Sequence, residues 1–191
     1  HAVLRYARAR DLLDHPNERS SHVAPTPRGG GLAIVLAFLA ALVAFYWMGR
    51  VNGMLLAALG GGGLMVAAVG FVDDHGGLSP RVRLLVHFAA AVWALYWLCG
   101  MPPLPLAGGV VLDGLLWTLA GTVALVWLLN LYNFMDGIDA IAGVEAVCVA
   151  LGVLLLGGFG TWLLVAAAAA GFLVLNWPPA RIFMGDVGSG F

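Results

Sequence analysis

The sequence contains no lysine, because all nine of its basic residues are arginine. This absence excludes a Walker-type phosphate-binding loop and Schiff-base chemistry within these residues, since both depend on a lysine amine. Cysteine is scarce too, and Cys99 and Cys148 lack the spacing of a zinc or redox motif. We expect both to be packing residues, with no disulfide framework and no zinc site.

Charge of either sign is also rare. Only 10% of the residues are charged, 62% are hydrophobic, and the mean hydropathy is +0.96. A soluble domain has about 25% charged residues, so this composition excludes an ordinary soluble protein, and we expect no nucleic-acid partner. The chain begins at His1, with neither an initiator Met nor a signal peptide. We interpret it as an internal part of a longer protein.

Long apolar runs dominate the chain. A membrane helix needs about 20 mostly apolar residues to cross the hydrocarbon core. Six runs meet this requirement, at 30–48, 54–72, 82–98, 114–133, 141–157 and 159–177. The second contains four consecutive glycines, which we interpret as sites of close helix packing in lipid. The predicted fold is an all-α, polytopic membrane protein with about six transmembrane helices, and residues 1–191 form a single integral membrane domain.

The arrangement of charges predicts which ends of the helices share one side. If residues 1–28 form a cytoplasmic loop, eight of the nine arginines lie in the cytoplasm and only Arg50 lies outside. This distribution agrees with the positive-inside rule. The same assignment places five aspartates at the cytoplasmic edge and Asp113 across the membrane; the five are Asp73, Asp74, Asp136, Asp139 and Asp186. Ionisable groups near lipid are typical of functional sites.

Asp73 and Asp74 end the second apolar run. Adjacent carboxylates repel each other unless a cation or an arginine lies between them. The alternative is a solvated helix terminus, but an acid is unfavourable next to the negative end of the helix dipole. The pair therefore favours a functional site.

Asp136 and Asp139 are expected to open the fifth run. Residues three apart on a helix share one face, so both carboxylates can point to one spot. The alternative is N-terminal capping, which explains one aspartate better than two. Asn133, one turn earlier, adds an uncharged donor and acceptor to the same candidate site.

A glycine-rich segment after the sixth run carries three further candidates. Gly185 allows a ligand to approach the backbone, and Asp186 can bind a metal. Phe183 either stacks on a planar base or anchors the chain in the membrane interface. Alone, this segment is weak evidence for a site.

Arginines at the starts of two runs are candidate phosphate contacts. Arg28 precedes three glycines, and backbone amides at a helix start together with an arginine form a candidate anion site. Arg81 and Arg83 begin the third run. For all three, the alternative is an arginine that only sets the topology. We interpret His87, on an apolar background, as a packing residue.

The ordered set of motifs resembles one family. The segments that carry the resemblance are Asp-His-Pro-Asn-Glu-Arg-Ser-Ser-His (14–22), Pro-Thr-Pro-Arg-Gly-Gly-Gly (25–31), Asp-Asp with Leu-Ser-Pro-Arg (73–81), Asn-Phe-Met-Asp-Gly-Ile-Asp (133–139) and Phe-Met-Gly-Asp-Val-Gly-Ser (183–189). They are similar to the polyprenyl-phosphate N-acetylhexosamine-1-phosphate transferases, which include the phospho-N-acetylmuramoyl-pentapeptide transferase. The resemblance implies a fold of roughly ten helices, of which this chain lacks the N-terminal spans, the C-terminal spans and a histidine-rich loop.

The resemblance also implies an activity. Members transfer a sugar phosphate from a UDP-sugar to a lipid phosphate, release UMP and use Mg²⁺, with Mn²⁺ as an alternative. The expected location is the bacterial inner membrane, with the active site in the cytoplasm; the expected partners are a UDP-N-acetylhexosamine, a polyprenyl phosphate and the lipid bilayer, and a homodimer is left open.

The resemblance assigns roles to individual residues. Asp186 is the implied metal ligand, and Asp73, Asp74, Asp136 and Asp139 are the implied catalytic residues, with Asp73 the candidate base. The implied substrate-binding residues are His22, Thr26, Arg28, Asn133, Phe183, Gly185, Arg81 and Arg83.

Two departures point to one branch of the family. The muramoyl branch has a lysine where this chain has Gly77, and Met-Gly-Gly where this chain has Pro27-Arg28-Gly29-Gly30. Both favour the UDP-N-acetylhexosamine branch, which feeds O-antigen, common-antigen or teichoic-type glycans, with GlcNAc the expected sugar. We expect direct attack by the lipid phosphate. The alternative function is a cation-coupled transporter with an aspartate relay, which predicts acids near the bilayer midplane.

Overall fold

The computed structural model describes residues 1–14, 16, 24–158 and 160–191, and this part of the chain is mostly helical. Each of the six predicted apolar runs corresponds to a helix in the described residues, with boundaries that agree to within a few residues. The six helices are α2 (Gly31–Trp47), the continuous segment Gly53–Gly76, α5 (Pro80–Trp97), α6 (Gly114–Met135), α7 (Ile141–Leu155) and α8 (Thr161–Asn176).

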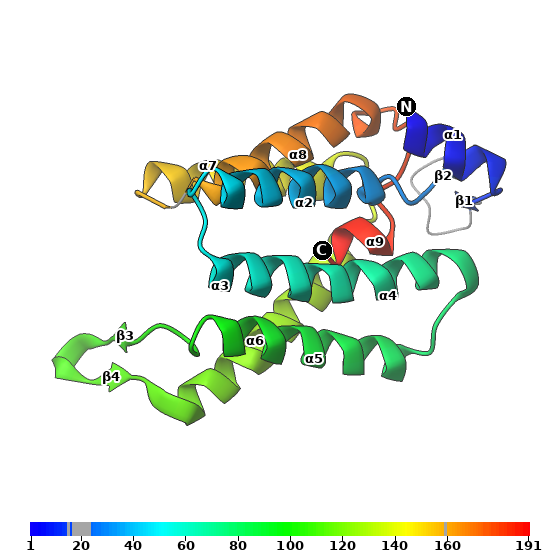
Figure 1. The fold of residues 1–191 in the computed structure, drawn as a ribbon. Helices are drawn as coiled ribbons and strands as arrows, with labels where there is room; N and C mark the ends of the chain where they lie inside the picture. Colours follow the sequence, from blue (N-terminus) through cyan, green and yellow to red (C-terminus); the bar gives the residue numbers. More distant parts are fainter. Residues whose placement is uncertain (15, 17–23, 159) are drawn as a thin grey trace.

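The helices stack in an order that differs from their order in the chain (Figure 1). Helix α7 packs on α8, α8 packs on α2, and the second half of Gly53–Gly76 packs on α5, which in turn contacts α6. The short helix α9 (Asp186–Ser189) lies between these two groups and contacts α2, α4 (Gly62–Gly76) and α6. This four-residue helix therefore connects the two halves of the bundle.

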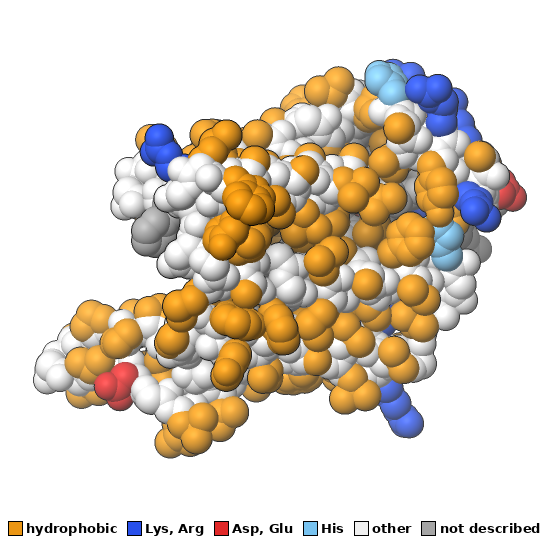
Figure 2. Space-filling model, viewed as in Figure 1, with side chains coloured by type: hydrophobic (Ala, Val, Ile, Leu, Met, Phe, Trp, Pro, Cys, Tyr) orange, Lys and Arg blue, Asp and Glu red, His pale blue; other side chains and the backbone are white. Residues whose placement is uncertain are grey.

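Apolar side chains cover much of the surface of these helices (Figure 2). Large hydrophobic side chains such as Leu116 and Leu155 are 82% and 89% exposed, which indicates a lipid environment rather than water. Two segments are long and apolar enough to cross a membrane, Gly53–Gly76 with mean hydropathy 2.1 and Gly114–Met135 with 1.7. These two segments and the exposed apolar side chains are typical of a membrane protein.

The number of crossings stays a prediction. Helices α2, α7 and α8 have 17, 15 and 16 residues. At about 1.5 Å per residue, they are shorter than the roughly 30 Å hydrocarbon core. The predicted runs were longer because apolar residues continue into the loops beyond each helix.

Two short strand pairs depart from the purely helical prediction. Strand β1 (Leu13–Asp14) pairs with β2 (Thr26–Pro27), and β3 (Leu104–Pro105) pairs with β4 (Val111–Leu112), both antiparallel. The second pair closes through η2 (Ala107–Gly109), where Gly108 and Gly109 adopt φ of +81° and +79°. Prolines cannot continue a helix interior, so this loop folds into a hairpin instead.

The four consecutive glycines allow close helix packing, as predicted. They lie at the junction of α3 (Gly53–Leu56), the π-helical turn η1 (Ala57–Gly61) and α4. The Trp93 indole N–H donates to the Ala57 carbonyl over 2.8 Å. A Cβ at Gly61 would lie 2.2 Å from the indole nitrogen, and one at Gly63 would lie 2.5 Å from the Phe191 ring. Only glycine permits both ring contacts.

Helix α1 (Ala2–Ala9) packs against the same end of the bundle as the start of α2. Its Leu4 and Ala7 belong to a buried cluster that also includes Phe172 and Met184. Its Tyr6 hydroxyl lies 3.0 Å from the Nε2 of His75, near the end of α4. The N-terminal segment is therefore fixed beside the polar motifs.

Candidate active site

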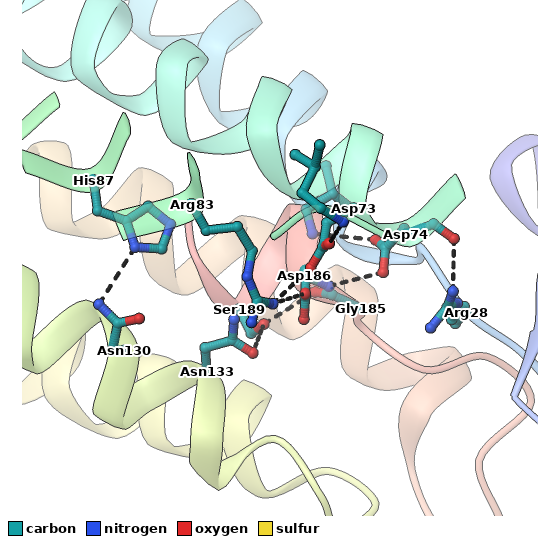
Figure 3. Close-up of polar contacts among 12 residues, drawn as sticks. Arg28, Asp73, Asp74, Arg83, His87, Asn130, Asn133, Gly185, Asp186 and Ser189 are labelled. Carbon is teal, nitrogen blue, oxygen red and sulfur yellow. Dashed lines mark hydrogen bonds and ion pairs between the residues drawn. The ribbon is translucent and has the colours of Figure 1, made fainter. Parts of the chain in front are cut away.

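Two carboxylates from distant parts of the chain contact one cationic nitrogen. The Nη1 of Arg83 lies 2.6 Å from an Asp73 carboxylate oxygen and 3.0 Å from an Asp186 carboxylate oxygen (Figure 3). Asp73 comes from α4, Arg83 from α5 and Asp186 from α9. The expected convergence of Asp73 and Asp186 is confirmed. Arg83, expected to bind substrate, lies between them.

The turn between α4 and α5 explains how Arg83 reaches Asp73. Gly77 adopts φ of +69°, which ends α4, and Ser79 caps α5 by accepting from the Val82 amide at 3.4 Å. The other Asp73 oxygen accepts from the Leu78 amide. The chain thus folds back within a few residues, and the first turn of α5 faces the last turn of α4.

Asp74 lies next to Asp73 but points elsewhere. It is only 4% exposed, and its two carboxylate oxygens accept from the backbone amides of Asp186 and Val187 at 3.1 and 3.2 Å (Figure 3). Its own carbonyl accepts from Arg28 Nη2 at 2.7 Å. The adjacent carboxylates therefore do not share one cation: one contacts Arg83, and the other contacts the backbone of α9.

The anion site predicted at residues 28–31 is not formed as expected. The amides of Gly30 and Gly31 donate to the carbonyls of Phe183 and Met184, each over 2.8 Å, and the Phe183 amide donates to the Pro27 carbonyl over 2.8 Å. These amides are used to align the two glycine-rich segments. They hold the residues before Asp186 against the start of α2.

Thr26, predicted to bind substrate, is buried, and its hydroxyl donates to the Ala24 carbonyl at 3.1 Å. Arg81 is exposed and makes no ion pair with other residues that the structure describes. His22 lies outside the described residues. His87 is buried with its Nδ1 3.3 Å from the Asn130 amide nitrogen, which confirms its interpretation as a packing residue.

Asp136 and Asp139 do not share a helix face, which corrects the prediction. Helix α6 ends at Met135 and α7 begins at Ile141, so both aspartates lie in the turn between them. The Asp139 carboxylate accepts from the Ala180 amide at 2.9 Å. No side chain caps α7, so N-terminal capping is not the explanation either. The charges of Asp186 and Asp74 raise the pKa of Asp136, so of the two aspartates in this turn Asp136 is the one that interacts with the acidic cluster.

Burial and neighbouring charge raise the pKa of two carboxyl groups outside the helical spans. Burial, followed by the charges of Asp186 and Asp74, raises the pKa of Asp136 to about 7. Burial, a hydrogen bond shared with Asp73 and the nearby carboxylates raise the pKa of Asp186 to about 6, against the opposing effect of Arg83. A cation placed among these groups would therefore be stabilised and would displace protons.

Sequence reasoning missed two residues that organise this site. The Ser189 hydroxyl on α9 lies 3.2 Å from the Asn133 amide oxygen on α6, and 3.1 Å from the Gly185 carbonyl. The buried Asn176 accepts from the Ala140 amide and donates to the Ile182 carbonyl, both at 3.0 Å. The sequence did offer a signal for Asn176, because a polar side chain at the end of an apolar run, directly before Trp-Pro-Pro, is a candidate for a structural hydrogen bond.

The carboxylates gathered here are few, but their number suits Mg²⁺. Among the described residues, no group of three or more His, Cys, Asp or Glu could hold a metal ion. Mg²⁺ usually takes one or two protein carboxylates and completes its six ligands with water and substrate phosphates. Asp73 and Asp186 both contact one cationic nitrogen, so these two carboxylates are the residues that would hold such an ion.

Comparisons with known proteins show the family of this chain. Residues 56–191 match the model of glycosyl transferase family 4. A "decaprenyl-phosphate N-acetylglucosaminephosphotransferase" of Mycobacterium leprae is 33% identical over 94% of this chain and 51% of its own length. A "probable undecaprenyl-phosphate N-acetylglucosaminyl 1-phosphate transferase" of Bacillus subtilis is 30% identical over 94% of the chain and 52% of its own. The chain spans about half the length of these relatives.

A third relative represents the other branch. The "phospho-N-acetylmuramoyl-pentapeptide-transferase" of Synechococcus elongatus is 33% identical over 87% of the chain and 50% of its own length. An apolar helical bundle with acidic groups gathered at one end, together with these relatives, places the chain in one family. The chain belongs to glycosyl transferase family 4. This membership gives no support to the transporter alternative.

Proposed function

We propose that the full-length protein transfers N-acetylhexosamine 1-phosphate, with GlcNAc the expected sugar, from a UDP-sugar to a polyprenyl phosphate and releases UMP. The observation that carries this proposal is the meeting of Asp73 and Asp186 at one cationic nitrogen. Such an acidic pair suits a reaction between two phosphates, because a shared divalent cation offsets their repulsion. The names of the relatives support the lipid phosphate and the sugar phosphate as substrates.

In this proposal Asp73 and Asp186 hold Mg²⁺, and Mn²⁺ is an alternative. When bound, the metal would supply positive charge that offsets the negative charge of the substrate phosphates. The exposed apolar helices support a site beside lipid, where a polyprenyl phosphate could reach it. The proposed location is the cytoplasmic face of the inner membrane. The loops that carry the acidic motifs also carry most of the arginines, and arginine-rich loops are typical of the cytoplasmic side.

The reaction forms one P–O bond and breaks another. An oxygen of the lipid phosphate attacks the phosphorus that carries the sugar, and the bond from that phosphorus to the bridging oxygen breaks. The electron pair of that bond leaves with UMP. A phosphate monoester has a second pKa of about 6, so the acceptor is mostly dianionic near neutrality and needs little help from a base.

The residues of this chain then mainly position groups and stabilise charge. With Mg²⁺ between Asp73 and Asp186, the five-donor guanidinium of Arg83 would be free to hold phosphate oxygens instead of these two carboxylates. Burial and the charges of Asp186 and Asp74 raise the pKa of Asp136 to about 7. A cation in the cluster would favour its carboxylate form, which adds to the negative charge that holds the ion.

The experiment that tests this function uses the full-length enzyme in nanodiscs. A panel of UDP-N-acetylhexosamines is supplied with undecaprenyl phosphate and Mg²⁺, and UMP release and the lipid product are measured. We expect the fastest turnover with UDP-GlcNAc and none with UDP-N-acetylmuramoyl pentapeptide, since Gly77 stands where the muramoyl branch has lysine. Lack of lipid-dependent UMP release from every donor would refute the proposal.

A further inference from the structure

We propose that Asp74 is a positioning residue, which fixes Asp186 for metal binding and itself touches neither the metal nor the substrates. This inference rests on the proposed function, in which Asp186 holds the metal. It separates two adjacent aspartates that the sequence presents as an equivalent pair. The argument depends on what each carboxylate contacts.

Both oxygens of the Asp74 carboxylate are used by the backbone of α9. Oδ1 accepts from the Asp186 amide at 3.1 Å, and Oδ2 accepts from the Val187 amide at 3.2 Å. Helix α9 has no side-chain cap from its own N-cap residue, Gly185. The first amides of a helix need acceptors, and here a residue on another helix supplies them. Asp74 thus orients the peptide groups on both sides of the Asp186 Cα.

The surroundings of Asp74 leave no access for a metal or a phosphate. The residue is 4% exposed. A Cβ at Gly185 would lie 2.7 and 3.0 Å from the two carboxylate oxygens, so the Gly185 backbone covers them. A Mg²⁺ ion needs near-octahedral access to each ligand oxygen. An enclosed carboxylate with two amide donors serves poorly as a ligand and well as a fixed acceptor.

Asp73 differs in what its carboxylate contacts, although its side chain is also largely buried, at 9% exposed. One of its oxygens contacts Arg83, which is 33% exposed and also contacts the Asp186 carboxylate. Its other oxygen accepts from the backbone amide of Leu78, in the turn that follows α4. No hydrogen bond joins Asp73 to the backbone of α9 in the described part of the chain. Asp73 therefore faces the reacting groups, while Asp74 supports the element that carries the second ligand.

Hydrogen exchange of the full-length enzyme in nanodiscs, without metal or substrate, tests this assignment. We expect Asp74→Asn to speed amide exchange in residues 183–190, because asparagine keeps one acceptor oxygen and loses the other. Asp73→Asn is the matched control, with the same chemical change one residue away. It should speed exchange only around Leu78. Exchange in 183–190 that is unchanged by Asp74→Asn, or equally changed by Asp73→Asn, would overturn the inference.

A second measurement separates positioning from a purely structural role. Loss of a residue that orients a metal ligand typically weakens metal affinity about 10–100-fold. We expect Asp74→Asn to raise the half-saturating Mg²⁺ concentration by this factor, while kcat recovers at high Mg²⁺ and the KM for the lipid is unchanged. Lowered kcat that no Mg²⁺ concentration restores, with normal half-saturation, would overturn it.

Asp74→Glu keeps the inference testable if Asp74→Asn folds poorly. The longer side chain keeps the charge and both acceptor oxygens but displaces them from the Asp186 and Val187 amides, so it should reproduce both effects. Normal Mg²⁺ dependence in folded Asp74→Glu would count against the inference. The exchange measurement needs no turnover, so the two claims can fail separately. A failed transferase assay would refute the proposed function alone. Unchanged exchange would refute only the role of Asp74.

Discussion

Replacing Gly70 with alanine tests whether the exact placement of α9 controls activity. A Cβ at this position would lie 2.3 Å from the Asp186 carbonyl oxygen and 2.7 Å from the Val187 nitrogen, whereas ordinary contact begins at 3.4 Å. The clash is with backbone atoms, so no side chain can rotate away. Helices α4 and α9 must therefore separate by about 1 Å, and Asp186 moves away from Asp73 by a similar amount.

The expected magnitudes follow from this displacement. Overpacking of this kind costs about 1–3 kcal/mol of stability. A misplacement of about 1 Å at a reacting centre costs roughly 100-fold in rate. We therefore expect Gly70→Ala to lower kcat by about two orders of magnitude while the enzyme still folds, because the stability cost is smaller than the usual total of about 5–15 kcal/mol.

The assay is UMP release by the full-length enzyme, with thermal unfolding measured on the same samples. Gly171→Ala on α8 is the matched control, since a Cβ there meets nothing within 4 Å. It should leave kcat unchanged and raise stability by up to about 1 kcal/mol, because alanine is the better helix residue. Folded Gly70→Ala with activity within about twofold of wild type, relative to the roughly 100-fold loss argued above, would refute the reasoning.

Other perturbations test the remaining contacts. Arg83→Gln leaves Asp73 and Asp186 without their shared cation, and we expect a loss of transferase rate that added Mg²⁺ only partly restores; full activity at low Mg²⁺ would contradict this. The raised pKa of Asp136, about 7, means that its protonated form is favoured on folding, so this stability is present at low pH and is lost as pH rises through 7. Metal-free enzyme should therefore have a higher Tm at pH 5.5 than at pH 8, Mg²⁺ should raise Tm more at pH 8, and Asp136→Asn should flatten the metal-free difference. Ser189→Ala removes the hydroxyl that donates to Asn133 over 3.2 Å and so joins α6 to α9. We expect kcat to fall by about tenfold or less, because a neutral hydrogen bond is worth about 0.5–1.5 kcal/mol. An unchanged rate would show that this hydrogen bond is dispensable.

Much of the fold could be predicted because hydrophobic runs of helical length have few other solutions in lipid. Backbone groups must be satisfied within each segment, which leaves helices as the outcome. The helix ends were less predictable: the prediction let Asp136 and Asp139 open α7, but the turn continues to Ala140, whose φ is +66°. Tertiary contacts decided this end, because Asn176 accepts from the Ala140 amide and Asp139 accepts from the Ala180 amide.

The amino-acid sequence by itself determined the apolar runs and indicated that Asp73, Asp186 and Arg83 belong to one candidate site. Only the tertiary structure decided which aspartate of the adjacent pair faces Arg83. Neighbours on a helix project about 100° apart, so two adjacent carboxylates must face different surroundings. Those surroundings come from α5 for Asp73 and from α9 for Asp74, more than a hundred residues later in the chain.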